Sequence, residues 1–302
     1  MYMGVYEIRD RDEAVSIMVD KANIAADTIK NNYDCCVAYY DEHLLEISIE
    51  QRRLLGEFEP ALQNDEFVMY LQPQVKRDGA AKGAEALVRW VHPSRGILTP
   101  YAFIDILENA GLIYKLDLYI WEKAAQKLAE WKEKGYGSYH ISVNISTKDF
   151  YIIDIYETFT GLINKYGIAA SNLHLEITET TLMTDFEKNM NIIHKLQGVG
   201  FRVEIDDFGS GYSSLNMLKD ISADVLKIDM GFLRKSENEV KGQDILESII
   251  TLAGKIGMDV ITEGVETKKQ LDMLTMMGCH EFQGYYFSKP VPVSEFEEKY
   301  LV

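Results

Sequence analysis

Two adjacent carboxylates, Asp206 and Asp207, stand where a β-favouring run meets a glycine-containing turn, within the stretch 202–212. Because neighbouring side chains of a strand point to opposite faces, both acids can serve one site only if the strand ends there. Paired acids at a strand tip are typical of sites for hard divalent cations and phosphate chemistry. The same residues also suit an ordinary solvated turn, so the rest of the chain must decide between the two interpretations.

Other polar residues interrupt apolar, strand-like runs elsewhere in the chain. They are Glu85, Asn144, Glu176, Lys227, Glu263 and Gln283. Burying such groups unpaired is costly, and convergence on bound cations would satisfy them together. A ligand set of carboxylates and one amide, without cysteine or histidine, favours Mg²⁺ or Mn²⁺ over zinc. Taken singly, each residue also has a plainer interpretation, at a strand rim or in a turn.

From residue 66 onward, eight strand-like runs alternate with helical ones, and this alternation predicts an α/β fold of the (β/α)₈ barrel type. The runs lie at 67–73, 84–90, 140–146, 173–178, 202–208, 224–229, 259–265 and 281–287. Barrel strands end at one rim, so a barrel would bring the scattered polar residues together. The rival, an open doubly wound sheet, is disfavoured because no G-x-G-x-x-G turn follows a first strand.

Helices are predicted between these strands and ahead of them. Those between the strands lie at 101–109, 116–134, 149–166, 185–199, 213–218, 240–256 and 268–277. Thr267 and Gln270 form a capping-box pattern before the last one. Residues 1–42 predict a small β-α-β fragment and residues 43–57 a connecting helix, which leaves 58–302 as the main domain.

The composition narrows the classes of partner. With 302 residues and a formal net charge of −17, the chain lacks the basic character that duplex nucleic acid or an anionic membrane would require. No apolar run reaches the roughly 18–20 residues of a membrane span, and the N-terminus lacks a signal-peptide pattern. Three cysteines form neither a disulfide framework nor a zinc spacing, so we expect a cytoplasmic protein.

Residues 58–302 resemble the EAL domain, a bacterial phosphodiesterase family that hydrolyses cyclic di-GMP to linear pGpG. The motifs that carry the resemblance occur in family order: E-A-L-V-R-W, V-N-I-S, L-E-I-T-E, D-D-F-G-S-G-Y-S-S-L, K-I-D, E-G-V-E-T and Q-G-Y-Y-F-S-K-P. The resemblance implies a TIM-like barrel whose first strand runs antiparallel to the others, which periodicity alone does not indicate.

The resemblance also implies a two-cation site of Mg²⁺ or Mn²⁺. The residues matching ligands of the first cation are Glu85, Asn144, Glu176 and Asp206. Asp206 would bridge to a second cation, completed by Asp207 and Glu263. Lys227 and Gln283 match residues that hold the attacking water, and Glu263 has also been viewed as the base. Calcium is expected to inhibit.

Further positions match substrate contacts and a regulatory loop. Those matching the substrate side are Gln72, Leu87 and Arg89. Those matching the loop through which homodimer formation influences metal binding are Glu179, Phe208, Gly209 and Ser210. Ser210 and Met230 replace a threonine and an arginine common in the family, so we expect altered dimer coupling and intact chemistry.

Glu204 departs from the family pattern, which commonly has a small or apolar residue there. It lies two residues before Asp206 and should therefore face into the barrel, where a buried acid needs a partner. His174 has the matching place before Glu176 on the neighbouring strand. We therefore expect a contact between Glu204 and His174, the alternative being water or a backbone amide.

Residues 4–42 resemble the last third of a GGDEF domain, without the cyclase signature. The leading interpretation of the chain is a metal-dependent cyclic di-GMP phosphodiesterase. One alternative is a receptor that keeps the ligand cleft but has lost catalysis, although such proteins usually lack several of the acids or the lysine. Another is a partner-regulated scaffold in which the N-terminal fragment matters most.

Overall fold

The computed structural model describes residues 2–29, 36–208, 221–231 and 239–301, and it divides into two compact units, Met1–Asn64 and Asp65–Val302. In the first unit, β1 (Met3–Val5) and β2 (Val37–Tyr39) pair in parallel, and α1 (Val15–Asp27) packs on both strands. The predicted β-α-β fragment is therefore present. The helix α2 (Glu42–Gln63) follows, and the Asp41 carboxylate caps it by accepting the Leu44 N–H.

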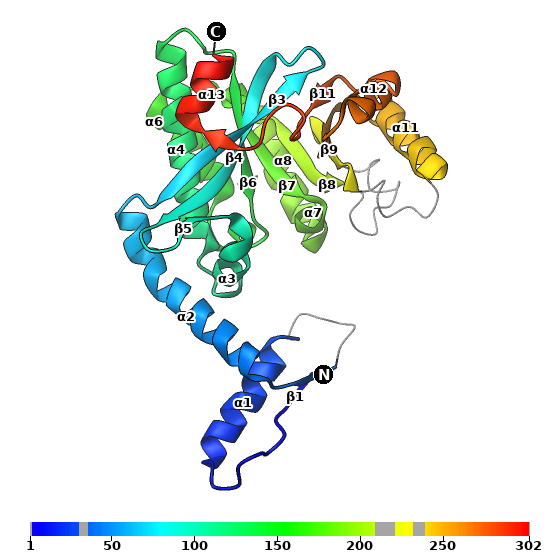
Figure 1. Ribbon diagram of the computed structural model, residues 1–302. Helices are drawn as coiled ribbons and strands as arrows, with labels where there is room; N and C mark the ends of the chain where they lie inside the picture. Colours follow the sequence, from blue (N-terminus) through cyan, green and yellow to red (C-terminus); the bar gives the residue numbers. More distant parts are fainter. Residues whose placement is uncertain (1, 30–35, 209–220, 232–238, 302) are drawn as a thin grey trace. The chain divides into compact units, whose positions relative to one another are not determined.

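Eight strands of the second unit form a closed barrel (Figure 1). Each overlaps a predicted run, although β11 takes up only the first two residues of the run predicted at 281–287. They are β3 (Phe67–Lys76), β4 (Ala81–His92), β6 (His140–Ile145), β7 (Leu173–Thr178), β8 (Val203–Phe208), β9 (Val225–Asp229), β10 (Asp259–Glu263) and β11 (Glu281–Phe282). The other seven barrel strands, β4 and β6 to β11, run parallel to one another, whereas β3 pairs antiparallel with both β4 and β11 and closes the barrel. The predicted fold class is confirmed.

The antiparallel direction of β3 has a local cause. Only a short turn separates β3 from β4, whereas a parallel connection needs a dozen or more residues. In that turn the Asp78 carboxylate accepts the Ala80 N–H, and Gly79 adopts a φ of 85°. Two short strands, β5 (Gly96–Leu98) and β12 (Val291–Pro292), extend the sheet beside β4 and β3.

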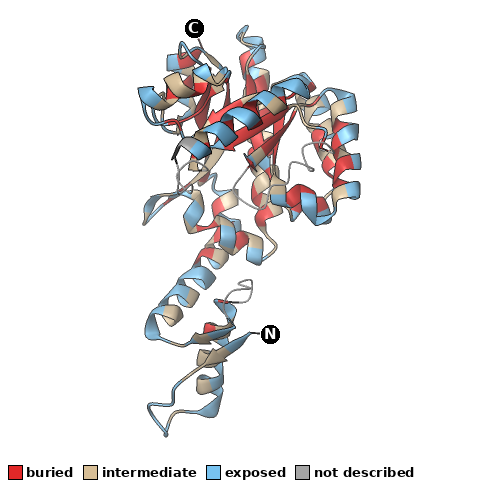
Figure 2. Cartoon of the chain, turned by 90° about the vertical axis from the view of Figure 1, so that its right-hand side faces the viewer, coloured by how far each residue is buried: buried red, intermediate tan, exposed pale blue. Residues whose placement is uncertain are grey.

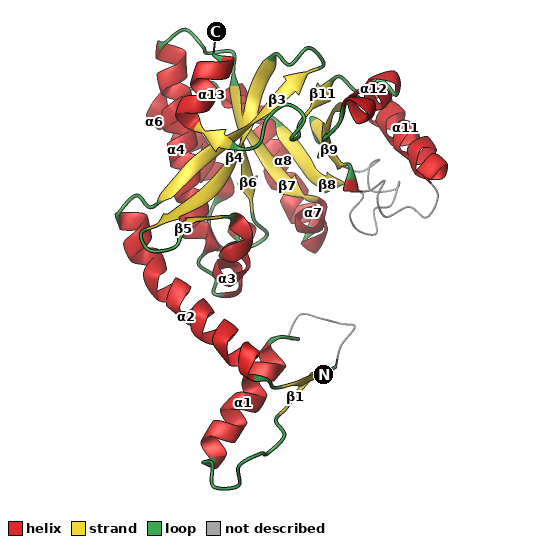
Figure 3. Cartoon of the chain, in the orientation of Figure 1, coloured by secondary structure: helices red, strands yellow, loops and turns green. Residues whose placement is uncertain are grey.

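Helices lie outside the barrel strands, as Figure 3 shows. They are η1 (Pro100–Ala102), α3 (Ile104–Asn109), α4 (Ile113–Glu133), α5 (Asp149–Ile152), α6 (Ile155–Tyr166), η2 (Ala170–Asn172), α7 (Glu179–Thr184), α8 (Phe186–Val199), α11 (Glu239–Lys255), α12 (Lys268–Met276) and α13 (Val293–Tyr300). The Thr267–Gln270 capping box is confirmed. The predicted helix at 213–218 lies outside the described residues.

Two helix predictions were wrong in their continuity. The predicted element at 101–109 is divided into the 3-10 helix η1 and the helix α3, because Phe103 between them has a non-helical φ of −142°. The predicted element at 149–166 is divided into α5 and α6, because Asp154 leaves the helical conformation and its side chain caps α6 by accepting the Glu157 N–H. An aspartate favours such a cap over a helix interior, since its carboxylate satisfies an otherwise unpaired amide. No helix in the described part of the chain is both long and apolar enough to cross a membrane.

The core of the second unit lies inside the barrel and between the barrel and its helices (Figure 2). Trp121 and Phe159 join α4 to α6 with ring centroids 4.5 Å apart, and the Trp121 indole N–H donates to the Asn144 carbonyl of β6. A second aromatic group consists of Phe67 of β3, Trp90 of β4 and Phe103, which directly precedes α3. This packing holds the strand ends that carry the polar residues.

Candidate active site

Lys227 of β9 lies inside the barrel, 1% exposed, among carboxylates from four other strands. Its Nζ is 2.7 Å from Glu263 Oε1 and 2.9 Å from Glu176 Oε1. It is 3.4 Å from both Glu85 Oε2 and Asp206 Oδ1. Residues spread over 178 positions of sequence therefore meet around one ammonium group, as the barrel predicted.

Two amides complete the cluster. The Asn144 side-chain N–H donates to Glu85 Oε1 at 3.2 Å, and Gln283 donates to Glu85 Oε2. Gln283 also donates to Gln72 Oε1 at 3.3 Å, which connects the cluster to β3. Strand register explains part of this arrangement, because Gln72 pairs with Glu85 and Asn144 pairs with Glu176 across neighbouring strands.

Crowding of like charge perturbs the titrating groups. Burial, followed by the Glu85 carboxylate, raises the pKa of Glu176 well above its usual range. Burial also raises the pKa of Glu263, although Lys227 opposes the shift. For Lys227, burial disfavours the charged form, but the surrounding carboxylates outweigh it and raise its pKa well above the usual value. One ammonium group therefore does not neutralise the cluster.

The donor set fits divalent cations. Glu176 Oε2 and Gln283 Oε1 are buried oxygens without a hydrogen-bond partner among the described residues. Buried polar atoms left unpaired are rare in folded proteins and point to a ligand. Oxygen ligands of this kind suit Mg²⁺ or Mn²⁺, and an ion among them would satisfy these atoms while offsetting the excess negative charge.

Asp207 takes up the left-handed backbone conformation, with φ of 55°, and is exposed. The pairing of β8 with β9 is irregular between Ile205 and Phe208, so the strict alternation of the strand breaks at the two acids. Partial burial of its carboxyl group and the Asp206 and Asp229 charges raise the pKa of Asp207. Sequence reasoning missed Asp229, although it ends β9 at the same rim and the strand-end rule could have found it.

The predicted substrate residues lie on β3 and β4. Gln72 donates to the Ser288 carbonyl at 3.3 Å, and the Arg89 guanidinium lies over the Tyr70 ring at 5.4 Å. Leu87 pairs with Tyr70 in the β3–β4 register. Burial lowers the pKa of Arg89, and the nearby Tyr70, Tyr285 and Glu85 partly offset this effect. Sequence reasoning did not single out Tyr285.

The predicted loop residues are only partly described. Glu179 is the first residue of α7, directly after the Thr178 cap, and Phe208 is buried at the end of β8. Gly209 and Ser210 lie outside the described residues. Their proposed coupling to dimer formation stays a prediction.

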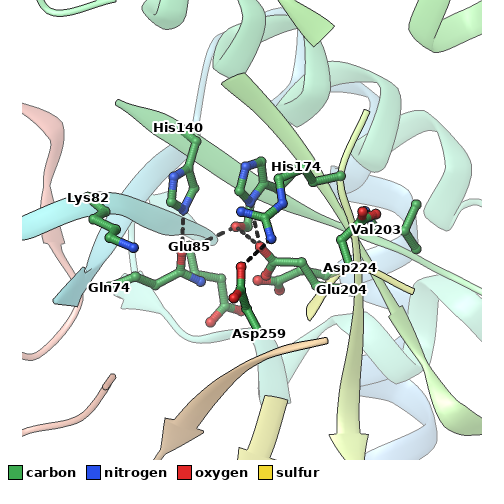
Figure 4. Close-up of polar contacts among 12 residues, drawn as sticks. Gln74, Lys82, Glu85, His140, His174, Val203, Glu204, Asp224 and Asp259 are labelled. Atoms are coloured by element: carbon green, nitrogen blue, oxygen red, sulfur yellow. Dashed lines mark hydrogen bonds and ion pairs between the residues drawn. The ribbon is translucent and has the colours of Figure 1, made fainter. Parts of the chain in front are cut away.

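The expected contact between Glu204 and His174 is confirmed. His174 Nδ1 lies 2.6 Å from Glu204 Oε1, and the Ser142 hydroxyl donates to the same oxygen at 3.2 Å (Figure 4). Burial of Glu204 opposes ionisation, but the hydrogen bond and charge of His174 outweigh it and hold the pKa of that carboxyl far below its usual range. The signal was available in the sequence as two polar residues at matching positions of adjacent strands.

The fold and the cluster define a class: a barrel protein of the (β/α)₈ type, with one strand reversed and an acidic cluster around a buried lysine inside it. Residues 56–290 match the family model described as EAL domain. This match covers more than half of the chain, and the chain belongs to the EAL domain family.

Two curated relatives illustrate the similarity. The bifunctional diguanylate cyclase/cyclic di-GMP phosphodiesterase MucR of Pseudomonas aeruginosa is 32% identical over 272 residues, which are 90% of this chain and 39% of the relative. The cyclic di-GMP phosphodiesterase PdeR of Escherichia coli is 33% identical over 240 residues, 80% of this chain and 36% of the relative. The chain thus spans well under half the length of these relatives.

Solved structures show the same fold. The Pseudomonas aeruginosa MucR phosphodiesterase in complex with c-di-GMP has a TM-score of 0.76 and 33% identity, with 81% of this chain and 99% of that chain covered. The EAL enzyme Bd1971, bound to cAMP and cyclic di-GMP, also has a TM-score of 0.76, with 31% identity over 83% of this chain and 69% of that chain.

Proposed function

We propose that this chain hydrolyses cyclic di-GMP to linear pGpG with two divalent cations, Mg²⁺ or Mn²⁺. The observation that carries the proposal is the ring of four carboxylates around the buried Lys227. Relatives and a solved neighbour named as cyclic di-GMP phosphodiesterases support the substrate. With Asp207, five carboxylates would face two divalent cations and one lysine, and the charges would balance.

Different residues of the chain would bind the cations, orient the attacking water and position the substrate. Glu85, Asn144, Glu176 and Asp206 would hold one cation, and Asp206, Asp207 and Glu263 the other. Bound cations of this kind lower the pKa of water and take up charge that develops on a phosphoryl group. Lys227 and Gln283 would orient the attacking water, because both point into the cluster and both contact Glu85. Gln72 and Arg89 would position the dinucleotide from the β3–β4 side.

Several finer features belong to the same proposal. We infer that the chain acts in the cytoplasm as a homodimer, that residues 1–42 derive from a GGDEF domain, and that 43–57 connect them to the EAL domain at 58–302. A receptor without turnover is the weaker alternative, because all the acids and Lys227 are present.

The proposal is tested by incubating the chain with cyclic di-GMP and Mn²⁺ and separating the products. We expect pGpG from the wild-type chain, and loss of turnover with retained binding for Glu85→Ala and Lys227→Ala. The matched control is Lys195→Met, at an exposed lysine of α8, which should keep full turnover. Binding without hydrolysis by the wild-type chain would support the receptor alternative, and unchanged turnover in the two variants would refute the assigned roles.

A further inference from the structure

A cavity of about 460 Å³ opens at the end of the barrel where the parallel strands begin. Residues at or just before the beginnings of strands line it, including Lys82 of β4, Arg202 before β8 and Val225 of β9. Three titratable side chains of adjacent strands also line it: His140 of β6, His174 of β7 and Glu204 of β8. Their exposed fractions are 9%, 3% and 0%.

The three side chains have the spacing of a metal site. One ligand atom from each lies within 4.8 Å of the other two. Two imidazoles with one carboxylate suit Zn²⁺ and related transition-metal ions, whereas Mg²⁺ prefers oxygen ligands alone. The donors come from consecutive barrel strands, so the sheet holds their backbones at a set spacing.

In both imidazoles, the contact made by Nε2 resembles the hydrogen bond that a metal-bound histidine makes through the ring nitrogen not bound to the metal. His140 Nε2 lies 2.7 Å from Gln74 Oε1, and His174 Nε2 lies 3.2 Å from the Ser171 carbonyl oxygen (Figure 4). Histidine ligands usually donate their second N–H to such an oxygen, which orients the ring. Because the Gln74 oxygen can only accept, His140 donates through Nε2 and keeps a lone pair on Nδ1. Burial also lowers the pKa of His140 well below its usual value, which favours the neutral, ligating form.

Two polar atoms of this group have no partner in the part of the chain that the structure describes. Glu204 Oε2 and Gln74 Nε2 are buried and make no hydrogen bond among the described residues. The contacts with His174 and Ser142 satisfy only the other carboxylate oxygen of Glu204. A carboxylate oxygen left unpaired inside a protein costs free energy of folding. The contact between Glu204 and His174 therefore does not satisfy all the buried polar atoms of this group.

We propose that His140, His174 and Glu204 bind one divalent transition-metal ion, with Zn²⁺ as the reference ion, at the amino-terminal mouth of the barrel. This site is separate from the carboxylate cluster. His174 and Glu204 each precede a cluster residue by two positions, which is about 7 Å along a strand. The ion would tie β6, β7 and β8 together at the end of the barrel opposite the reaction.

Binding requires a measurable rearrangement. The His140 and His174 rings are stacked, with centroids 3.8 Å apart and planes 5° from parallel. A metal ion lies near the plane of each imidazole that binds it, so the rings must tilt out of the stack. The ion would also replace the proton between His174 Nδ1 and Glu204 Oε1. Both ring environments should therefore change on binding.

The test uses the full chain with ¹⁵N-labelled histidine rings, in excess Mg²⁺ so that the carboxylate cluster is occupied, and a titration with Zn²⁺. We expect one Zn²⁺ retained per chain after dialysis, with ring-nitrogen shifts at His140 and His174 among the six histidines. This measurement on the wild-type chain does not depend on how any variant folds. Unshifted ring nitrogens at these two residues, or retention explained by other histidines, would overturn the proposal and leave the Glu204–His174 contact as an ion pair.

Variants separate ligands from neighbours. His174→Asn should abolish retention of Zn²⁺, and Gln74→Ala, which removes the outer contact to His140, should weaken it about tenfold. The matched control is Ser142→Ala, which should still retain Zn²⁺. This variant removes a hydroxyl that donates to Glu204 and Gln74 but is not a proposed metal ligand. Equal affinity of His174→Asn and the wild-type chain for Zn²⁺ would contradict the ligand assignment.

Discussion

Replacing Lys227 with methionine gives the sharpest test of the cluster. The unbranched methionine fills much of the volume of the lysine stem, so the main loss is the positive charge. Removing one partner of a buried charge group costs about 3–5 kcal/mol of unfolding free energy, because the remaining charges stay buried without compensation. The raised pKa values of Glu176 and Glu263 limit the loss, since these carboxyls can take up protons once the lysine is gone.

The measurement is urea unfolding followed by tryptophan fluorescence. All three tryptophans, Trp90, Trp121 and Trp131, lie in the unit Asp65–Val302, so the signal reports on the barrel alone. With a urea slope of about 3 kcal/mol per M, the midpoint in EDTA should fall by about 1–1.7 M. In saturating Mn²⁺ we expect a much smaller fall, because bound cations would supply the missing positive charge.

The comparison between EDTA and Mn²⁺ decides the outcome. A loss of equal size under both conditions would show that Lys227 acts on stability independently of any cation site. Wild-type stability of the variant in EDTA would show that the four carboxylates do not need the ammonium group. The control substitution Lys195→Met removes an exposed lysine and should leave the midpoint unchanged under both conditions.

Three further predictions concern other parts of the barrel. Replacing Mg²⁺ with Ca²⁺ should inhibit hydrolysis, because the larger ion accepts looser geometry and activates water poorly; equal rates would contradict this. Gly284→Ala should lower the unfolding free energy by about 1–3 kcal/mol, because a Cβ would lie 2.2 Å from the Val265 carbonyl oxygen. It should also reduce turnover by displacing the neighbouring Gln283. A variant with the melting temperature and turnover of the wild-type chain would refute this prediction. Burial, followed by the nearby Asp149 charge, raises the pKa of Asp117 well above its usual value. The folded chain therefore keeps a proton that the unfolded chain loses above about pH 4. The unfolding free energy should therefore fall as pH rises from about 4 through the raised pKa, and Asp117→Asn should flatten that fall; parallel urea midpoints from pH 4 to 8 for both chains would exclude the effect.

Local signals explain why much of the architecture was predictable. Each barrel strand is a run of β-favouring, mostly apolar residues, and such runs can be recognised in the sequence without knowledge of tertiary contacts. The reversed first strand was also encoded locally, because Asp78 and Gly79 form a turn too short for a parallel crossover. Hydrophobic periodicity alone missed it, since strand runs look alike in either direction.

The sequence by itself determined which side chains could meet, whereas the closed barrel decided which of them do. Glu85, Glu176, Asp206 and Glu263 were predictable as polar interruptions of strands, but their approach to within 3.4 Å of Lys227 Nζ follows from the closure of the sheet. Contacts across many positions depend on strand order and stagger, which no local pattern records. The stack of His140 on His174 arises in the same way, from the register of two neighbouring strands.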